Sequence, residues 1–150
     1  MNQTVRLGLS ERLSYNLSGG LFFNQHNMYF ADFSYFAKRY FPEPWGDRFG
    51  GIFYNLGGDW CNASDKYIQG HLMYESPFIL LRFLKPNPKA HKYLVSERFY
   101  LSQLWTPVLP NYSELGYGIG SDLFHIALFL GFEKFKYQSV GLKFALELFR

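Results

Sequence analysis

Residues 140–149 read VGLKFALELF, and this stretch decides the fold because every second residue in it is large and apolar. The apolar members alternate with mixed ones, and they are Val140, Leu142, Phe144, Leu146 and Leu148. A period of two residues indicates a β-strand, because successive side chains of a strand point to opposite faces of its sheet. The sequence therefore predicts a closing strand with one wholly apolar face and one mixed face.

The same alternation recurs along the whole chain. Residues 124–132 repeat it, and the polar residues 133–138 join them to the closing strand, which predicts a hairpin. Further strands are predicted at residues 5–17, 50–60, 67–76, 93–105 and 112–120, with weaker ones before residue 37. We therefore expect an all-β fold, an antiparallel meander of about seven to nine strands that forms part or all of a transmembrane β-barrel.

Local features refine this prediction. Ser18-Gly19-Gly20 is typical of a turn, and residues 50–60 and 67–76 are expected to pair as a hairpin. Residues 77–84, PFILLRFL, have no two-residue period, which predicts a short helix or an irregular cap. Glycines at 116, 118 and 120 leave one face of their strand bare, so other side chains are expected to fill the space above them.

Composition sets the class of protein. The 150 residues suit a single domain, 1–150, and 21% of them are aromatic while only 18% are charged. An average soluble domain has about 25% charged residues. Few charges and many aromatic rings favour a sheet that faces lipid on one side.

Several other classes are disfavoured. There is no run of about 18 apolar residues, which a membrane-spanning helix needs, and the net charge of +3 is too small and scattered to indicate nucleic-acid binding. Cys61 is the only cysteine, so no internal disulfide is expected. The N-terminus does not resemble a secretory signal, so we expect a fragment, a processed chain or a misplaced start codon.

Two arrangements of the sheet compete. In a membrane barrel the apolar face meets lipid, whereas a soluble β-barrel or sandwich would turn it inward to bind an apolar ligand with residues such as Phe53, Phe99 and Phe129. The mixed face is rich in Gly, Ala and Ser with isolated charges, which is typical of a barrel interior. Aromatic residues near strand ends would form interfacial girdles: Tyr15, Trp60, Tyr67, Tyr93, Trp105, Tyr112 and Tyr137.

Four stretches carry a family resemblance: residues 27–36 (NMYFADFSYF), 64–84, 104–120 and the closing hairpin. They resemble the C-terminal part of an uncharacterised outer-membrane barrel family of Bacteroidetes-type bacteria, whose members carry a carboxypeptidase-regulatory-like domain ahead of the barrel. The resemblance implies that the chain lies in the cell outer membrane and is the C-terminal portion of a longer barrel. Its expected partners are outer-membrane lipid and the missing N-terminal strands.

The closing strand, residues 138–149, also resembles the signal by which the barrel-assembly machinery recognises its clients. A polar residue, a glycine and two hydrophobic residues match its spacing, namely Ser139, Gly141, Phe144 and Leu146. The terminal aromatic residue is displaced, because Phe149 is out of phase with Leu148 and Arg150 follows it. The assembly machinery is therefore an expected partner during insertion.

The sequence shows no catalytic or cofactor motif. The histidines His26, His71, His91 and His125 share no metal-ligand spacing. An outer-membrane hydrolase would need a serine and a histidine on one wall, and the pairs that could meet combine Ser102 or Ser113 with His71 or His125. No spacing favours such a pair, so a noncatalytic protein without cofactor or metal is expected.

Overall fold

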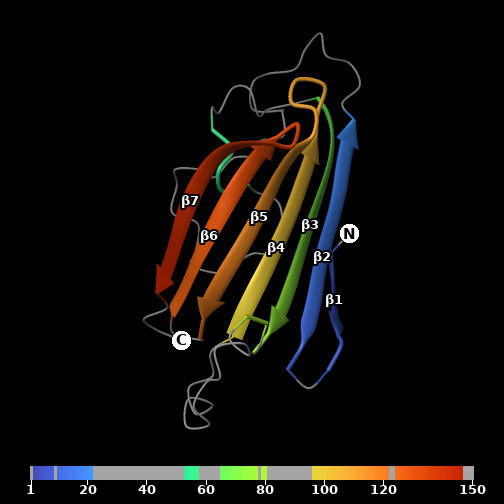
Figure 1. Ribbon diagram of the computed structural model, residues 1–150. Coiled ribbons are helices and arrows are strands. Elements are labelled where there is room, and N and C mark those ends of the chain that lie inside the picture. The colour runs from blue at the N-terminus through green and yellow to red at the C-terminus, as the bar shows by residue number, and fades with distance from the viewer. Residues whose placement is uncertain are drawn as a thin grey trace.

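The computed structural model describes residues 2–8, 10–21, 53–57, 65–77, 79–80, 96–121 and 124–146. These residues form an all-β fold in which seven antiparallel strands follow one another in a single sheet (Figure 1). The strands are β1 Asn2–Arg6, β2 Arg12–Leu21, β3 Lys66–Ser76, β4 Ser96–Trp105, β5 Tyr112–Gly120, β6 Phe124–Glu133 and β7 Lys136–Leu146. The predicted meander is confirmed. In the described part of the chain, no helix has the length and apolarity needed to cross a membrane.

The first predicted strand, residues 5–17, is wrong in its extent, because the chain reverses within it. Val5 pairs with Leu13, and the Leu7 N–H donates to the Glu11 carbonyl at 3.1 Å to close the turn. Ser18-Gly19-Gly20 is not a turn but the end of β2. Gly20 serves close packing, because a Cβ there would lie 2.5 Å from the Tyr67 ring.

The β6–β7 hairpin is confirmed, with a shorter turn than predicted. Glu133 pairs with Lys136, so only two residues form the turn. The register shifts after Gly131, which pairs with Ser139, whereas Phe132 pairs with Tyr137. Gln138 is therefore an extra residue, a β-bulge, and the bulge turns Tyr137 to the same face as Phe132.

Two predicted elements are corrected. Of the predicted strand 50–60, residues 50–52 and 58–60 lie outside the described residues, and residues 53–57 do not pair with β3. Instead β3 pairs with β2 and β4, and Phe53 makes an isolated bridge. Among residues 77–84 the described ones, 77 and 79–80, form bends and not a helix, which agrees with the irregular cap. In both segments the backbone N–H groups bind glutamate side chains, Glu114 and Glu97, in place of strand or helix carbonyls.

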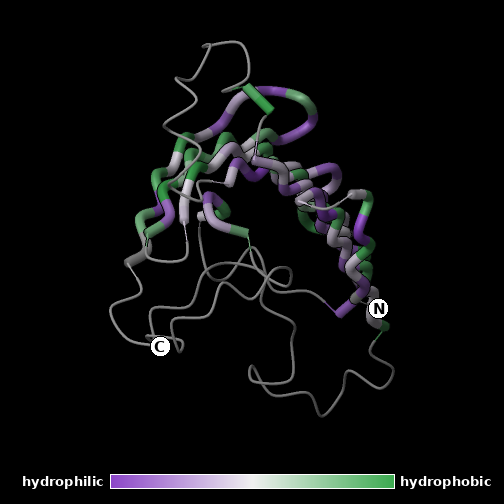
Figure 2. Tube along the Cα trace, turned by 90° about the horizontal axis from the view of Figure 1, so that it is seen from below, coloured by the Kyte–Doolittle hydropathy of each residue, from purple (hydrophilic) through white to green (hydrophobic). Residues whose placement is uncertain are grey.

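The sheet curves into an arc, with residues 53–57 on its concave side (Figure 2). The concave face holds the two buried clusters of the described residues. One consists of Phe53, Leu104 and Tyr112, and the other of Tyr100, Ala127 and Phe129. The convex face exposes large apolar side chains on all seven strands: Val5, Leu17, Leu21, Ile68, Leu72, Phe99, Leu101, Trp105, Leu115, Phe124, Ile126, Leu128, Tyr137, Val140, Leu142 and Phe144.

Candidate functional site

A row of small and polar residues crosses the concave face at one level. Each member is the registered neighbour of the next from β2 to β7, and the row reads Asn16, His71, Ser102, Glu114, Gly131 and Ser139. His71 and Glu114 are buried, and His71 Nδ1 lies 2.8 Å from Ser102 Oγ. Since buried polar groups are costly without partners, such a row requires partners from its neighbours or from another segment.

Residues 53–57 supply those partners, and we call them the inner segment. The Glu114 carboxylate is 2% exposed and accepts hydrogen bonds from the backbone N–H groups of Tyr54, at 2.9 Å, and Asn55, at 2.7 Å. The Tyr112 hydroxyl donates a third bond at 2.8 Å. The carboxylate therefore fixes two consecutive peptide groups of the inner segment to the middle of the sheet.

Phe53 anchors the beginning of the inner segment. Its side chain is fully buried, and its ring centroid lies 4.9 Å from that of His71 and 5.6 Å from that of Tyr112. It packs with Leu104 in the same cluster. Phe53 thus covers the polar row between β3 and β5.

Asn55 anchors the segment to the last hairpin. Its side-chain amide donates to the Phe129 carbonyl at 2.8 Å, and its own carbonyl accepts a bond from Ser139 Oγ at 3.4 Å. Two glycines make room for it: a Cβ on Gly131 would lie 3.3 Å from the Asn55 Cβ, and one on Gly141 would overlap the Asn55 side-chain oxygen. The inner segment therefore needs glycine at both positions to approach the strands closely.

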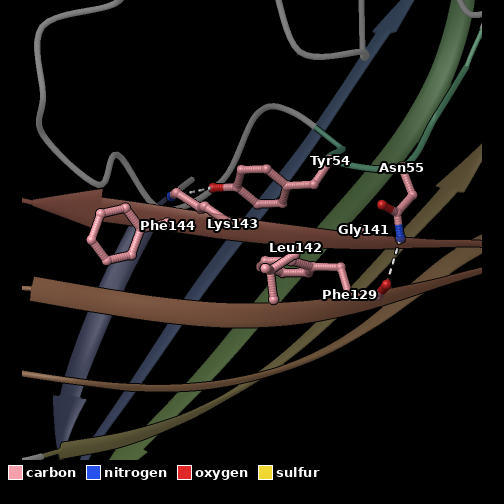
Figure 3. Close-up of a pocket in the computed structure, with 7 residues that line it drawn as sticks. All are labelled: Tyr54, Asn55, Phe129, Gly141, Leu142, Lys143 and Phe144. Carbon is pink, nitrogen blue, oxygen red and sulfur yellow. Dashed lines mark hydrogen bonds between the residues drawn. The ribbon is translucent and has the colours of Figure 1, made fainter.

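A cavity of about 240 Å³ lies beside Tyr54 at the β7 edge of the sheet (Figure 3). Its lining residues are Tyr54, Asn55, Phe129, Gly141, Leu142, Lys143 and Phe144. Lys143 Nζ donates to the Tyr54 hydroxyl at 3.2 Å and lies 4.7 Å from the centroid of the Tyr54 ring. The Tyr54 ring also packs on Phe129, with the centroids 4.4 Å apart. The cavity wall thus combines one ammonium group with three aromatic rings, those of Tyr54, Phe129 and Phe144.

Bare glycine positions are filled as the sequence predicts. A Cβ on Gly116 would lie 2.5 Å from the Phe129 ring, and one on Gly118 would lie 2.7 Å from the His125 ring. The Tyr100 ring packs on Phe129 at 5.3 Å between centroids. The glycines of β5 therefore leave room for large side chains of the neighbouring strand β6.

A second buried carboxylate lies at the convex face. Glu97 is 0% exposed, although Phe99, two residues further along the same face, is 40% exposed. It accepts bonds from the backbone N–H groups of Ile79 and Leu80, each at 2.8 Å, and from the Tyr117 hydroxyl at 2.6 Å. Residues 79–80 thus fold back over the outside of the sheet and cover a charge that would otherwise lie on an apolar surface.

The proposed assembly-signal residues all lie on β7. Ser139 and Gly141 occupy concave-face positions, where they contact Asn55, whereas Phe144 is exposed on the convex face. Leu146 pairs with Phe124 at the end of the strand. Two of these residues therefore have a packing role in the folded protein, and the recognition role stays a prediction.

The structure brings together one of the serine–histidine pairs. His71 bonds Ser102, but Phe53 lies over the pair, while Ser113 occupies a convex-face position and His125 lies on the concave face 3.4 Å from the Tyr100 hydroxyl. No group of three His, Cys, Asp or Glu side chains converges in the described ranges. His26, His91, Cys61, Trp60 and Tyr93 lie outside the described residues.

Two residues predicted to belong to the interfacial girdles, Tyr112 and Tyr67, lie on the concave face instead. Tyr112 is buried in the concave cluster and bonds Glu114, and Tyr67 packs against the same cluster, because both occupy concave-face positions. Trp105 and Tyr137 are exposed on the convex face, and their girdle role stays a prediction. The alternation of β5 already assigned Tyr112 and Glu114 to one face, which is the signal that sequence reasoning missed.

Fold and site together define an antiparallel β-meander that binds a segment of its own chain on its concave face. Residues 1–119 match the C-terminal domain of a family of unknown function, DUF5686. The chain belongs to this family. The matched region contains β1 to β4, the inner segment and nearly all of β5. Neither the curated proteins nor the solved structures contain a match to the chain.

Proposed function

We propose that this chain forms part of the wall of a noncatalytic outer-membrane β-barrel with a transport, assembly or scaffold role in the cell envelope. One observation carries the proposal: two adjacent rows of residues that cross the sheet on opposite faces. The convex row is apolar throughout, Tyr15, Leu72, Leu101, Leu115, Leu130 and Val140. The polar row of the concave face is offset from it by one residue along each strand. An apolar row beside a polar, internally bonded face is what a barrel wall presents to lipid and lumen.

Strand length supports a wall of membrane thickness. The strands β2 to β7 are 9 to 11 residues long. A strand tilted by about 45° needs about 9–11 residues to cross the hydrocarbon core. These strands therefore have the length of membrane-spanning β-barrel strands. They exceed the roughly five or six residues common in soluble sheets.

The soluble alternative fits less well. It needs Phe53, Phe99 and Phe129 to face one apolar interior. Phe53 and Phe129 lie on the concave face, whereas Phe99 is 40% exposed on the convex face. The concave interior also holds hydrogen-bonded groups such as Glu114 and Asn55 beside its two buried clusters. We therefore favour the lipid-facing assignment of the convex surface.

The sheet also needs further strands. The seven strands of the described residues leave β1 and β7 parallel to each other, so antiparallel pairing cannot join these two edges directly. In lipid, edge N–H and C=O groups must be paired. Closure with antiparallel pairing throughout requires an odd number of additional strands, and we assign them to the N-terminal part of a longer barrel.

The finer assignments follow the family resemblance. We place the protein in the outer membrane of Bacteroidetes-type bacteria, with a carboxypeptidase-regulatory-like domain ahead of the barrel. Its partners are outer-membrane lipid and, during insertion, the barrel-assembly machinery, which would read Ser139, Gly141, Phe144 and Leu146 in β7. Because Ser139 and Gly141 also seat Asn55, recognition would precede the docking of the inner segment.

Fractionation of the native protein tests the proposal. We expect it in the outer-membrane fraction, extracted only by detergent, with a gel mobility that changes on boiling because a closed barrel resists unfolding in detergent. A monomeric chain that is folded and soluble in plain buffer would overturn the lipid-facing assignment.

A further inference from the structure

The turn between β6 and β7 has an unusual composition for its geometry. Both of its residues have left-handed backbones, with φ of 49° at Lys134 and 64° at Phe135. Two-residue hairpin turns of this kind strongly prefer Asn-Gly or similar pairs, because a Cβ crowds the backbone there. A bulky aromatic residue at this position is therefore not explained by the formation of the turn.

Packing does not explain Phe135 either. Its side chain is 88% exposed, the highest value among the exposed large hydrophobic residues of the described ranges. The backbone around it is held in place, because the Lys134 N–H donates to the Asn111 carbonyl of the neighbouring turn at 3.1 Å. The turn thus projects an aromatic ring outward from a fixed position.

The surroundings of the ring indicate the kind of surface that it meets. Lys134 and Lys136, on either side of it, are both exposed. The bulge at Gln138 turns Tyr137 outward, where it is 60% exposed and continues the convex surface through Val140. An aromatic ring between two ammonium groups, at the end of an apolar face, fits the boundary between hydrocarbon and anionic headgroups.

We propose that the β6–β7 turn docks into the membrane interface, with the Phe135 ring below the phosphate level and Lys134 and Lys136 bound to the phosphate groups of anionic membrane lipid. This inference rests on the proposed function, because it needs the convex face to lie in a bilayer. It adds a specific lipid contact at one end of the wall and explains why this turn keeps a strained aromatic residue.

Site-specific fluorescence in nanodiscs tests the inference. An environment-sensitive dye is attached to Phe135→Cys in a Cys61→Ser background of the native protein, and quenchers are placed on the lipid chains or in the water. Leu128→Cys, at the middle of the convex face, reports on the proposed function, and Gly57→Cys, at the exposed end of the inner segment, is the aqueous control. Boiling-dependent gel mobility shows that each labelled protein is folded.

We expect the Leu128 dye to be quenched from deep in the lipid, and the Phe135 dye to be blue-shifted and quenched from shallow lipid positions. Anionic lipid should increase the Phe135 signal, and the double variant Lys134→Gln, Lys136→Gln should remove that increase. If the Leu128 dye behaves as proposed while the Phe135 dye is quenched only from water, the inference is overturned and the barrel stands. A Phe135 dye shielded from both quenchers would indicate a protein partner and also overturn it. Quenching of the Leu128 dye only from water would overturn the proposed function itself.

Discussion

Glu114 and Glu97 perform the same task on opposite faces of the sheet. Each is a fully or nearly fully buried carboxylate that accepts two consecutive backbone N–H groups and one tyrosine hydroxyl. An irregular segment has no strand partner for its peptide groups, and buried peptide groups must be bonded. A strand glutamate with two acceptor oxygens meets that need, so one residue fixes a loop without a further strand.

Replacement of Glu114 tests this role. Glu114→Ala leaves the Tyr54 and Asn55 N–H groups and the Tyr112 hydroxyl without their acceptor, at about 1–3 kcal/mol for each unsatisfied group. Because the segment relaxes in part, we expect a total loss of about 3 kcal/mol in the free energy of unfolding. Denaturant titration in detergent, followed by gel mobility, measures it.

Glu133→Gln is the matched control for that change. Glu133 accepts an exposed bond from Gln138 at 3.2 Å, so its replacement should change stability by less than about 0.5 kcal/mol. Glu114→Gln keeps one acceptor oxygen and should fall between the two. Equal stability of Glu114→Ala and the parent protein would show that the carboxylate does not hold the inner segment.

Gly116 offers a second test at the residue scale. A Cβ there would lie 2.5 Å from the Phe129 ring, so Gly116→Ala should displace the ring and lower the free energy of unfolding by about 1–3 kcal/mol. Gly57→Ala is the control, because a Cβ at Gly57 meets no atom within 4 Å. Phe129→Leu should lower the free energy of unfolding less in the Gly116→Ala variant than in the parent protein. Additive effects in denaturant titrations would contradict the contact.

At the scale of elements, alternation predicted the strands and failed at the segments between them. It located β5 at its exact bounds, and it located the β6–β7 hairpin except for the bulge, because the large apolar residues of each strand share one face. It assigned residues 50–60 to a strand because the apolar residues Ile52, Tyr54 and Leu56 recur at every second position. Nothing local shows that Glu114, about sixty positions later, binds their backbone. Contacts of this kind depend on the fold and have no periodic signature.

The β6–β7 turn gives a prediction for an element as a unit. Phe135→Gly removes the Cβ from a left-handed position, and we expect the free energy of unfolding to rise by about 1 kcal/mol. Phe135→Ala is the control, because it removes the ring but keeps the Cβ and so should give no gain. Thermal unfolding in detergent compares the two. A gain from Phe135→Ala equal to that from glycine would mean that the ring, and not the backbone, is the source of strain.

The whole molecule is a curved sheet whose two faces require different surroundings. The concave face satisfies its polar groups with the inner segment, while the convex face exposes apolar side chains from β1 to β7. The sequence predicted this two-faced sheet, since the pattern of large and small residues determines which positions share a face. It did not predict that a segment of the same chain fills the interior, because that depends on Glu114 and on the space left by Gly131 and Gly141.

The convex face supports a prediction that separates lipid from water as its surroundings. Leu128 lies at the middle of β6, beside Leu142 and Tyr117, and is 45% exposed, whereas Leu21 ends β2 and is 64% exposed. In a bilayer, arginine on a barrel's lipid face costs about 2–4 kcal/mol at the midplane and about 0–1 kcal/mol near the interfaces. In water, arginine at an exposed leucine changes stability by about 0.5 kcal/mol or less at either position. We therefore expect Leu128→Arg to reduce stability strongly in lipid vesicles and Leu21→Arg to reduce it little, as measured by denaturant unfolding. Because the two leucines differ in depth along the strand and not in chemistry, equal small effects would indicate that water surrounds this face, and the barrel proposal would fail.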